Sequence, residues 1–162
     1  MSSITRLNSK EKKQFLQQLQ NQYGYEKGLT QDILVNKNKG RYYLVTPELL
    51  EFDFEEQRVE TIGMYFATLV SPNDLRLTIE GSQIIGPYAT KNVHAIDDEE
   101  TKQWIRGQNL SIETELAGWL ILKHESDKGV DYLGCGKIVQ KNDEQVIHNY
   151  IPKTRYVRSV IE

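Results

Sequence analysis

The apolar and polar positions near the start of the chain predict a helix. Apolar residues at positions 15, 16, 19 and 23 recur at helical spacing and form one stripe, while Lys and Gln occupy the other face. Asn8 precedes this stripe as a capping residue, Glu11 stands where it completes a capping box, and Gly24 follows the stripe. We therefore expect a helix over residues 8–23 with its apolar stripe against a core.

Four β-rich runs follow this helix. Residues 32–36 and 41–45 are separated by a four-residue turn that contains glycine, which is typical of a β-hairpin. A short helix is expected directly after the hairpin, where Thr-Pro can open it. Further strands are expected at residues 58–69 and 75–79. Gly63 is unusual inside a strand and indicates a bend, or a partly helical conformation, in the first of these two runs.

Residues 81–88 contain two glycines and a proline, a composition typical of a boundary between domains. We therefore predict a small α+β domain over residues 1–85 and a second domain over residues 86–162. The residues of the first domain do not indicate a function by themselves.

The second domain is expected to begin with a strand and a short helix. Residues 92–96 predict the strand, and Asp97 is a suitable N-cap for the helix that follows. Acidic residues 98–100 then occupy the first helical turn, where the helix dipole favours negative charge. Gly107 ends the helix. Because capping explains the acidic run, we do not interpret it as a metal site.

Residues 117–158 predict a β-rich remainder. An apolar strand, a charged turn, a second strand, another turn and a closing segment follow one another. The second strand contains Gly134-Cys135-Gly136, and glycines on both sides of one residue allow a close approach of the backbone. That approach is either to a neighbouring strand, at a bulge or a tight barrel corner, or to a ligand. The expected fold class is α+β.

The charge of the chain limits how it can bind a polyanion. Its 162 residues include 20 basic and 23 acidic residues, a net charge of −3. The average field therefore does not favour nucleic acid, and a polyanion has to be bound by a local patch. Acidic residues are concentrated at positions 97–100, whereas Lys153, Arg155 and Arg158 lie near the end of the chain.

Targeting signals and disulfide bonds are not expected. No apolar run approaches the roughly 20 residues of a membrane span, and the N-terminal residues lack the apolar core of a signal peptide. We therefore expect a cytoplasmic protein without a membrane partner. Cys135 is the single cysteine, which excludes internal disulfide bonds and a multi-cysteine zinc site.

The sequence indicates a binding module rather than an enzyme, and we expect no catalytic residue, metal ligand or cofactor. Cys135 would need an adjacent base or cation to act as a nucleophile, so we interpret it as a buried structural residue. His94, His124 and His148 lack the short spacings of zinc ligands. The glycine-rich phosphate-binding motifs and the nucleophile elbow are also missing from the sequence.

Tyr150 stands close to Lys153 and Arg155 in a combination that suits nucleic acid. Basic groups hold phosphate, and an aromatic ring can stack on an unpaired base. In the alternative interpretation Tyr150 packs inside the barrel and the basic residues are simply solvated. Three other aromatic residues are expected in the core: Tyr42, Tyr43 and Trp104.

Three segments carry a resemblance to a known family. They are GWLILK at residues 118–123, LGCGK at residues 133–137 and NYIPK at residues 149–153. Together they resemble the PUA domain, an RNA-binding fold. The closer similarity is to the PUA-like tail of the Nol/Nop/Sun RNA cytosine-5 methyltransferases, and to stand-alone archaeal proteins related to that tail. The first half of the chain resembles the α+β domain that precedes the PUA domain in those archaeal proteins.

The resemblance implies a β pseudo-barrel with a short helix beside it, and RNA bound along that helix and the adjoining strands. We therefore expect a small N-terminal α+β domain followed by a PUA-like pseudo-barrel. Two features depart from the methyltransferase tails: the hairpin of residues 123–134 is long and acidic, and the sequence contains no methyltransferase catalytic domain. The candidate RNA-binding residues, the last two included on charge and position alone, are Arg106, Lys123, Lys137, Tyr150, Lys153, Arg155, Lys91 and Arg158.

These observations favour non-catalytic RNA binding, in the modification of rRNA or tRNA or in ribosome assembly, with structured RNA as the partner. One alternative is a protein-interaction module that joins a separate RNA-modifying enzyme, which the acidic balance favours. Another is a small enzyme with its site in a cleft between the two halves.

Overall fold

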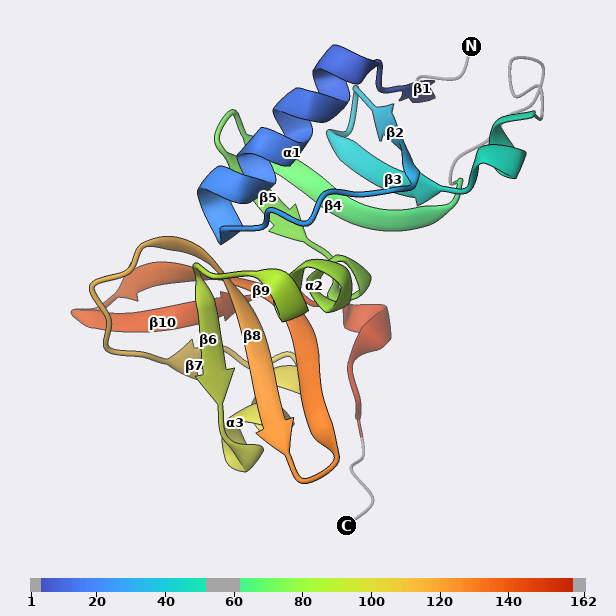
Figure 1. Ribbon diagram of the computed structural model, residues 1–162. Helices are drawn as coiled ribbons and strands as arrows, with labels where there is room; N and C mark the ends of the chain where they lie inside the picture. The colour runs from blue at the N-terminus through green and yellow to red at the C-terminus, as the bar shows by residue number, and fades with distance from the viewer. Residues whose placement is uncertain (1–3, 52–61, 159–162) are drawn as a thin grey trace.

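Two five-stranded sheets, one in each half of the chain, form the frame of the protein (Figure 1). The computed structural model describes residues 4–51 and 62–158. The first sheet has the order β1-β2-β3-β4-β5 and every neighbouring pair in it is antiparallel. Its strands are β1 (Ile4–Arg6), β2 (Asp32–Asn36), β3 (Arg41–Val45), β4 (Met64–Ser71) and β5 (Asp74–Leu77).

Helix α1 (Ser9–Tyr23) covers the first sheet. Asn8 and Glu11 form the expected capping box, and Gly24 ends the helix in the left-handed conformation. Phe15 and Leu19 are buried on the sheet side, within one core cluster that also contains Phe66 of β4. The helix and the following hairpin of β2 and β3 are confirmed, as is the short helix after the hairpin, which is the 3-10 helix η1 (Pro47–Glu51).

The region between the halves, where two glycines and a proline indicated a domain boundary, is helical. Helix α2 (Ile79–Ile85) begins after Thr78, whose side chain accepts a hydrogen bond from the Gly81 N–H, and the 3-10 helix η2 (Gly86–Tyr88) follows. A Cβ at Gly81 would come within 2.2 Å of the Phe66 carbonyl oxygen, so the glycine lets α2 lie against β4. The expected strand over residues 75–79 is therefore wrong in its last part, because β5 ends at Leu77.

The expected strand over residues 58–69 is confirmed only from Met64 onward. Residues 58–61 lie outside the described part of the chain. Gly63, immediately before the strand, has a φ of 67°, and a Cβ there would come within 2.4 Å of the Leu44 carbonyl oxygen. A residue other than glycine would be strained in this conformation, so Gly63 forms the bend that enters β4.

The second sheet curls into a half-barrel with the order β6-β8-β9-β10-β7 (Figure 1). Strand β6 runs parallel to β8, and the other pairs are antiparallel. Helix α3 (Asp98–Ile105) lies beside the half-barrel. The predicted fold class is confirmed. The strands are β6 (Val93–Ile96), β7 (Leu110–Ser111), β8 (Gly118–Ser126), β9 (Gly129–Lys141) and β10 (Glu144–Asn149), and the 3-10 helix η3 (Lys153–Arg155) closes the described chain.

The Gly134-Cys135-Gly136 segment makes close contacts within the protein. The register of β8 and β9 shifts next to it, as expected of a bulge, and Gly134 has a φ of 88°. A Cβ at Gly136 would come within 2.3 Å of an Ile147 methyl carbon and 2.7 Å of the Trp104 ring. The structural interpretation of these glycines, a bulge with a close approach of neighbouring elements, is therefore confirmed.

The two halves share a continuous core. Tyr23 of α1 lies in the same buried cluster as Trp119, Ile121 and Cys135 of the second sheet. Backbone contacts join the same surfaces, because the Thr90 N–H donates to the Tyr23 carbonyl oxygen at 2.9 Å. No helix in the described ranges is long and apolar enough to cross a membrane.

Candidate nucleic-acid interface

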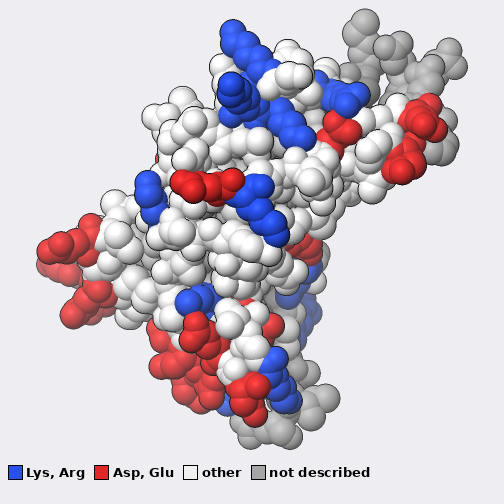
Figure 2. Space-filling view, in the orientation of Figure 1, with Lys and Arg blue, Asp and Glu red and all other residues white. Residues whose placement is uncertain are grey.

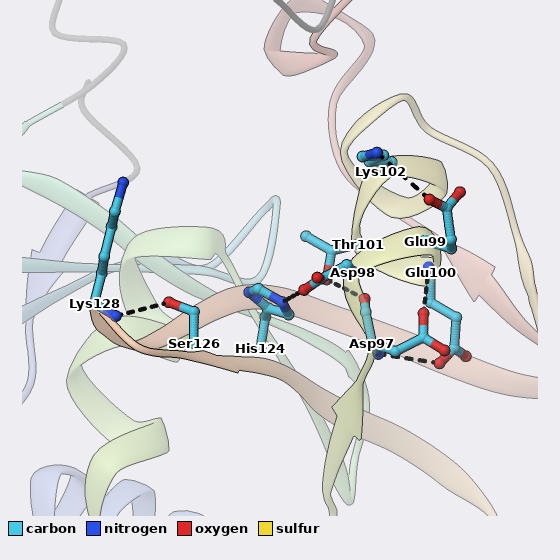
Figure 3. A network of polar contacts seen from close by, with 9 residues as sticks. All are labelled: Asp97, Asp98, Glu99, Glu100, Thr101, Lys102, His124, Ser126 and Lys128. Atoms are coloured by element: carbon cyan, nitrogen blue, oxygen red, sulfur yellow. Dashed lines mark hydrogen bonds and ion pairs between the residues drawn. The ribbon is translucent and has the colours of Figure 1, made fainter. Parts of the chain in front are cut away.

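The N-terminal end of α3 is strongly acidic, and each acidic side chain there except Glu99 supports the local fold (Figure 3). Asp97 accepts a hydrogen bond from the Glu100 N–H at 2.8 Å, and Glu100 accepts one from the Asp97 N–H at 3.1 Å. Asp98 lies 2.6 Å from the Nε2 atom of His124 on β8. Glu99 pairs with Lys102 at 3.4 Å. The predicted cap is thus confirmed, and we call Asp97, Asp98, Glu99 and Glu100 the acidic end of α3.

Acidic side chains also dominate the protein surface around this end of α3. Figure 2 shows acidic residues gathered over α3 and over the outer end of β9 and β10, while basic residues on this face lie over α1 and at separate positions elsewhere. An RNA phosphate chain that followed α3 along its whole length would therefore pass the acidic end, where Asp98 and Glu99 are exposed.

The C-terminal end of α3 is basic, because the closing segment of the chain returns to it. The Val157 N–H donates to the Ile105 carbonyl oxygen at 2.9 Å, and the Tyr156 ring packs against Gly107. These contacts place the backbone just before Arg158 against the last turn of α3, which Arg106 follows. A Cβ at Gly107 would come within 2.2 Å of that ring, so the glycine that ends the helix also seats the closing segment.

Four exposed cations, Arg106, Lys153, Arg155 and Arg158, form what we call the basic rim. Arg155 donates to Glu80 of α2 at 2.7 Å, so its charge is partly neutralised and the rim is tied to α2. Within the described residues the other three form no ion pair, and their charges are therefore available to an anionic ligand. All four were candidate residues on the sequence.

Two other sequence candidates have partners elsewhere. Lys91 donates from Nζ to the Asn21 carbonyl oxygen at the end of α1, at 3.3 Å. Lys123 pairs with Glu125 on the same strand at 2.8 Å, and this hydrogen bond raises the pKa of the lysine. Lys123 also precedes His124, which contacts the acidic end. These two lysines therefore do not join the basic rim.

The remaining candidates, Lys137 and Tyr150, lie in a group of aromatic and basic side chains on the face of the second sheet that meets the first half. The Tyr150 ring lies 4.8 Å from the Trp119 ring and 4.6 Å from the His148 ring, centroid to centroid. Lys137 Nζ is 5.9 Å from the centre of the Trp119 ring. Arg76 of β5 is 5.5 Å from the Tyr150 ring and 6.0 Å from the Trp119 ring. We call these five residues the aromatic–cation cluster.

Sheet register explains why the sequence did not identify Trp119 and His148. Lys137 of β9 is paired with Trp119 of β8 on one side and with His148 of β10 on the other. The three side chains therefore form a row across the sheet, since paired residues share a face. Arg76 is added by the first half of the chain, where no sequence motif marked it.

A crevice of about 100 Å³ connects the aromatic–cation cluster to the basic rim. Both halves line it: Tyr65 and Arg76 come from the first sheet, and Tyr150, Pro152 and Arg155 come from the closing segment. Tyr150 is 39% exposed, so it is neither fully packed in the barrel nor fully solvated. The crevice therefore places Arg76 and Tyr150 of the cluster on the same concave surface as Arg155 of the rim.

Cys135 is unsuited to nucleophilic catalysis. It is buried, and burial raises the pKa of its thiol from the ordinary 9.0 to about 11. Its sulfur lies 3.7 Å from the Tyr23 hydroxyl oxygen. A thiol that stays protonated at neutral pH is a poor nucleophile, so the interpretation of Cys135 as a buried structural residue is confirmed. Within the described residues no group of three His, Cys, Asp or Glu side chains is placed to hold a metal ion.

Comparison with known protein families identifies the second half. Residues 91–156 match the family described as the methyltransferase RsmF PUA domain. No curated protein matches the chain. The matched range runs from two residues before β6 to the residue after η3, so it contains α3, the half-barrel and three of the four residues of the basic rim, while Arg76 lies outside it. Residues 91–156 therefore form a PUA-like domain, related to that of the Nol/Sun-type methyltransferases.

Proposed function

We propose that this protein binds structured RNA without catalysing a reaction on it, and that it acts in the cytoplasm in the modification of rRNA or tRNA or in ribosome assembly. The similarity to the PUA domain of a methyltransferase supports this proposal. The proposed role includes stand-alone action, as in the archaeal proteins that the sequence resembles.

The observation that carries the proposal is the basic rim. Arg106, Lys153 and Arg158 form no ion pair within the described ranges, although the chain has a net charge of −3. Exposed cations on the end of α3 and on the closing segment that packs against it suit RNA phosphates, and such contacts position a protein on RNA without reading its sequence. Structured RNA is then recognised by its shape and backbone.

Binding to tRNA and rRNA fragments across a salt series tests the proposal. The Lys153→Ala/Arg158→Ala variant should bind more weakly at low salt. The slope of log affinity against log salt should also become shallower, by about 1.4 to 1.8 for two lost phosphate contacts.

A matched control distinguishes the effect of the basic rim from the effect of removing two positive charges anywhere on the surface. Lys39→Ala/Lys141→Ala removes the same charge from exposed lysines at two hairpin turns, and it should leave the slope nearly unchanged. Absence of RNA binding by the wild type at low salt would contradict the proposal, and so would equal effects of the two double variants.

The acidic end of α3 favours a second candidate, a protein-interaction module that joins a separate RNA-modifying enzyme. The side chains of Asp98 and Glu99 are 85% and 79% exposed. A partner enzyme bound through them should be released by neutralising these two residues and should stay bound after ribonuclease treatment. Retention of RNA binding in the same variant would assign the two surfaces to different partners.

A further inference from the structure

The aromatic–cation cluster is built from both halves of the protein. Trp119, Lys137, His148 and Tyr150 belong to the PUA-like domain, whereas Arg76 belongs to β5 of the first sheet. The core beneath them is continuous across the halves. Arg76 is thus held at the Tyr150 ring by the same packing that fixes the two sheets together.

Packing alone does not account for the composition of the cluster. A basic side chain is not needed to bury an aromatic ring, yet Arg76 and Lys137 both lie near the Trp119 ring. In addition, the buried N–H of Trp119 has no hydrogen-bond partner in the described part of the protein. Unpaired buried donors are uncommon in native proteins, and each needs a physical explanation.

A nucleotide combines the properties that this cluster can recognise. Its base offers a planar face for stacking on a partly exposed aromatic ring, and its phosphate offers negative charge to neighbouring cations. The crevice beside Tyr150 continues to Arg155 of the basic rim. A single RNA strand that leaves the rim can therefore reach the cluster without crossing the acidic end of α3.

We infer that the aromatic–cation cluster binds one unpaired nucleotide of the RNA, with the base stacked on Tyr150 and the adjoining phosphates near Arg76 and Lys137. This inference rests on the proposed RNA-binding function and defines its substrate class. The ligand is a structured RNA that also carries an unpaired nucleotide, at an end, a loop or a bulge, because bases within a duplex do not offer a free face. The first half of the protein then takes part in recognition through Arg76.

Two hairpin RNAs with the same stem, one blunt and one with a short single-stranded 3′ tail, test the inference by fluorescence anisotropy. The wild type should bind the tailed RNA more tightly. Tyr150→Ala should weaken binding of the tailed RNA by roughly 5-fold to 150-fold, the range expected for one lost base stack, and should leave binding of the blunt RNA unchanged. Tyr150→Phe should retain the preference for the tail, because it keeps the ring.

Two further variants test whether the effect is specific to the aromatic–cation cluster. Arg76→Gln keeps a long polar side chain and should weaken binding of the tailed RNA in particular. Tyr88→Ala is the matched control, because Tyr88 is 50% exposed and has Lys27 Nζ at 3.8 Å from its ring centre, outside the cluster. It should bind both RNAs like the wild type.

The outcomes separate this inference from the proposed function. Equal binding of the tailed and blunt RNAs by the wild type would overturn the inference and leave the proposed function standing. A loss of blunt-hairpin binding in Tyr150→Ala, with an unchanged thermal unfolding midpoint, would overturn the assignment of Tyr150 to an unpaired base. No binding of either RNA would overturn the proposed function and the inference together.

Discussion

The two ends of helix α3 differ in charge and in what their charged residues do. At the N-terminal end, Asp97 and Glu100 cap the helix and Asp98 contacts His124. At the C-terminal end, Arg106 follows the last turn of α3, Arg158 follows the residue that bonds to that turn, and neither side chain forms an ion pair within the described ranges. The acidic charges therefore have partners within the fold, whereas these basic charges are free to meet a ligand.

This difference changes the expected path of RNA on the protein. The resemblance to PUA domains implied binding along the helix and the adjoining strands. Here the acidic end lies on that path, and repulsion between carboxylates and phosphates opposes binding there. The basic rim and the aromatic–cation cluster instead lead away from α3, toward the junction of the two halves. The comparison thus predicts that RNA contacts one end of α3 and avoids the other.

The largest expected effect concerns the core at the junction of the two halves, which contains Cys135, and it should not distinguish the two ends of α3. Burial raises the pKa of the Cys135 thiol from 9.0 to about 11. The folded state therefore holds the thiol proton more tightly than the unfolded state. Below pH 9 the thiol is protonated in both states and the free energy of unfolding is unaffected. As the pH rises from 9 toward 11, the unfolded state loses its proton first, and the free energy of unfolding falls by about 2–3 kcal/mol.

Urea unfolding followed by tryptophan fluorescence at several pH values measures this loss. Cys135→Ala removes the titrating group and should flatten the decline between pH 9 and 11. Part of the decline should remain at still higher pH, because burial also raises the pKa of Tyr23. Parallel pH profiles for wild type and Cys135→Ala would contradict the assignment of this pH dependence to Cys135.

Loss of the N-cap at the acidic end of α3 should affect the stability of the protein but not its RNA affinity. Asp97→Ala removes the N-cap of α3 and should lower the free energy of unfolding by about 1 kcal/mol, while RNA affinity should change by less than about twofold because the acidic end lies off the RNA path. Asp127→Ala is the matched control, since it removes the same charge from an exposed turn residue. Tighter RNA binding by Asp97→Ala, but not by Asp127→Ala, would show that RNA passes the acidic end.

Local sequence signals predicted the elements whose ends depend on neighbouring residues. The capping box at Asn8 and the N-cap residue Asp97 identified the starts of α1 and α3, because caps are formed within a few residues. The same reasoning failed at α2. There the contact that allows a helix is between Gly81 and the Phe66 carbonyl oxygen, which are far apart in sequence, so the glycine resembled a loop residue.

In the candidate site too, local sequence signals predicted one part and long-range contacts formed the other. The residues of the basic rim could be named from a charge cluster near the chain end and a helix end, although their proximity depends on the contact between Val157 and Ile105. The aromatic–cation cluster could not be predicted beyond Lys137 and Tyr150. Trp119 and His148 join it through the register of three strands, and Arg76 joins it through the packing of two sheets.

The smallest expected effect compares two exposed ion pairs, one at each side of the PUA-like domain. Glu80 pairs with Arg155 of the basic rim at 2.7 Å, and Glu99 pairs with Lys102 on α3 at 3.4 Å. Exposed pairs of this kind contribute about 0–1 kcal/mol, so Glu80→Gln and Glu99→Gln should both fold normally. Each substitution removes one negative charge and releases one cation.

Only the cation released at the rim should reach RNA. Glu80→Gln should therefore tighten RNA binding by about twofold to threefold at low salt and make the salt slope steeper by a fraction of one contact. Glu99→Gln should have little effect, because Lys102 lies on the same short helix as the remaining carboxylates of the acidic end. Parallel salt titrations of the two variants measure the difference directly. Equal gains in affinity would mean that RNA responds only to net charge, and the contrast between the two ends of α3 would then have no role in recognition.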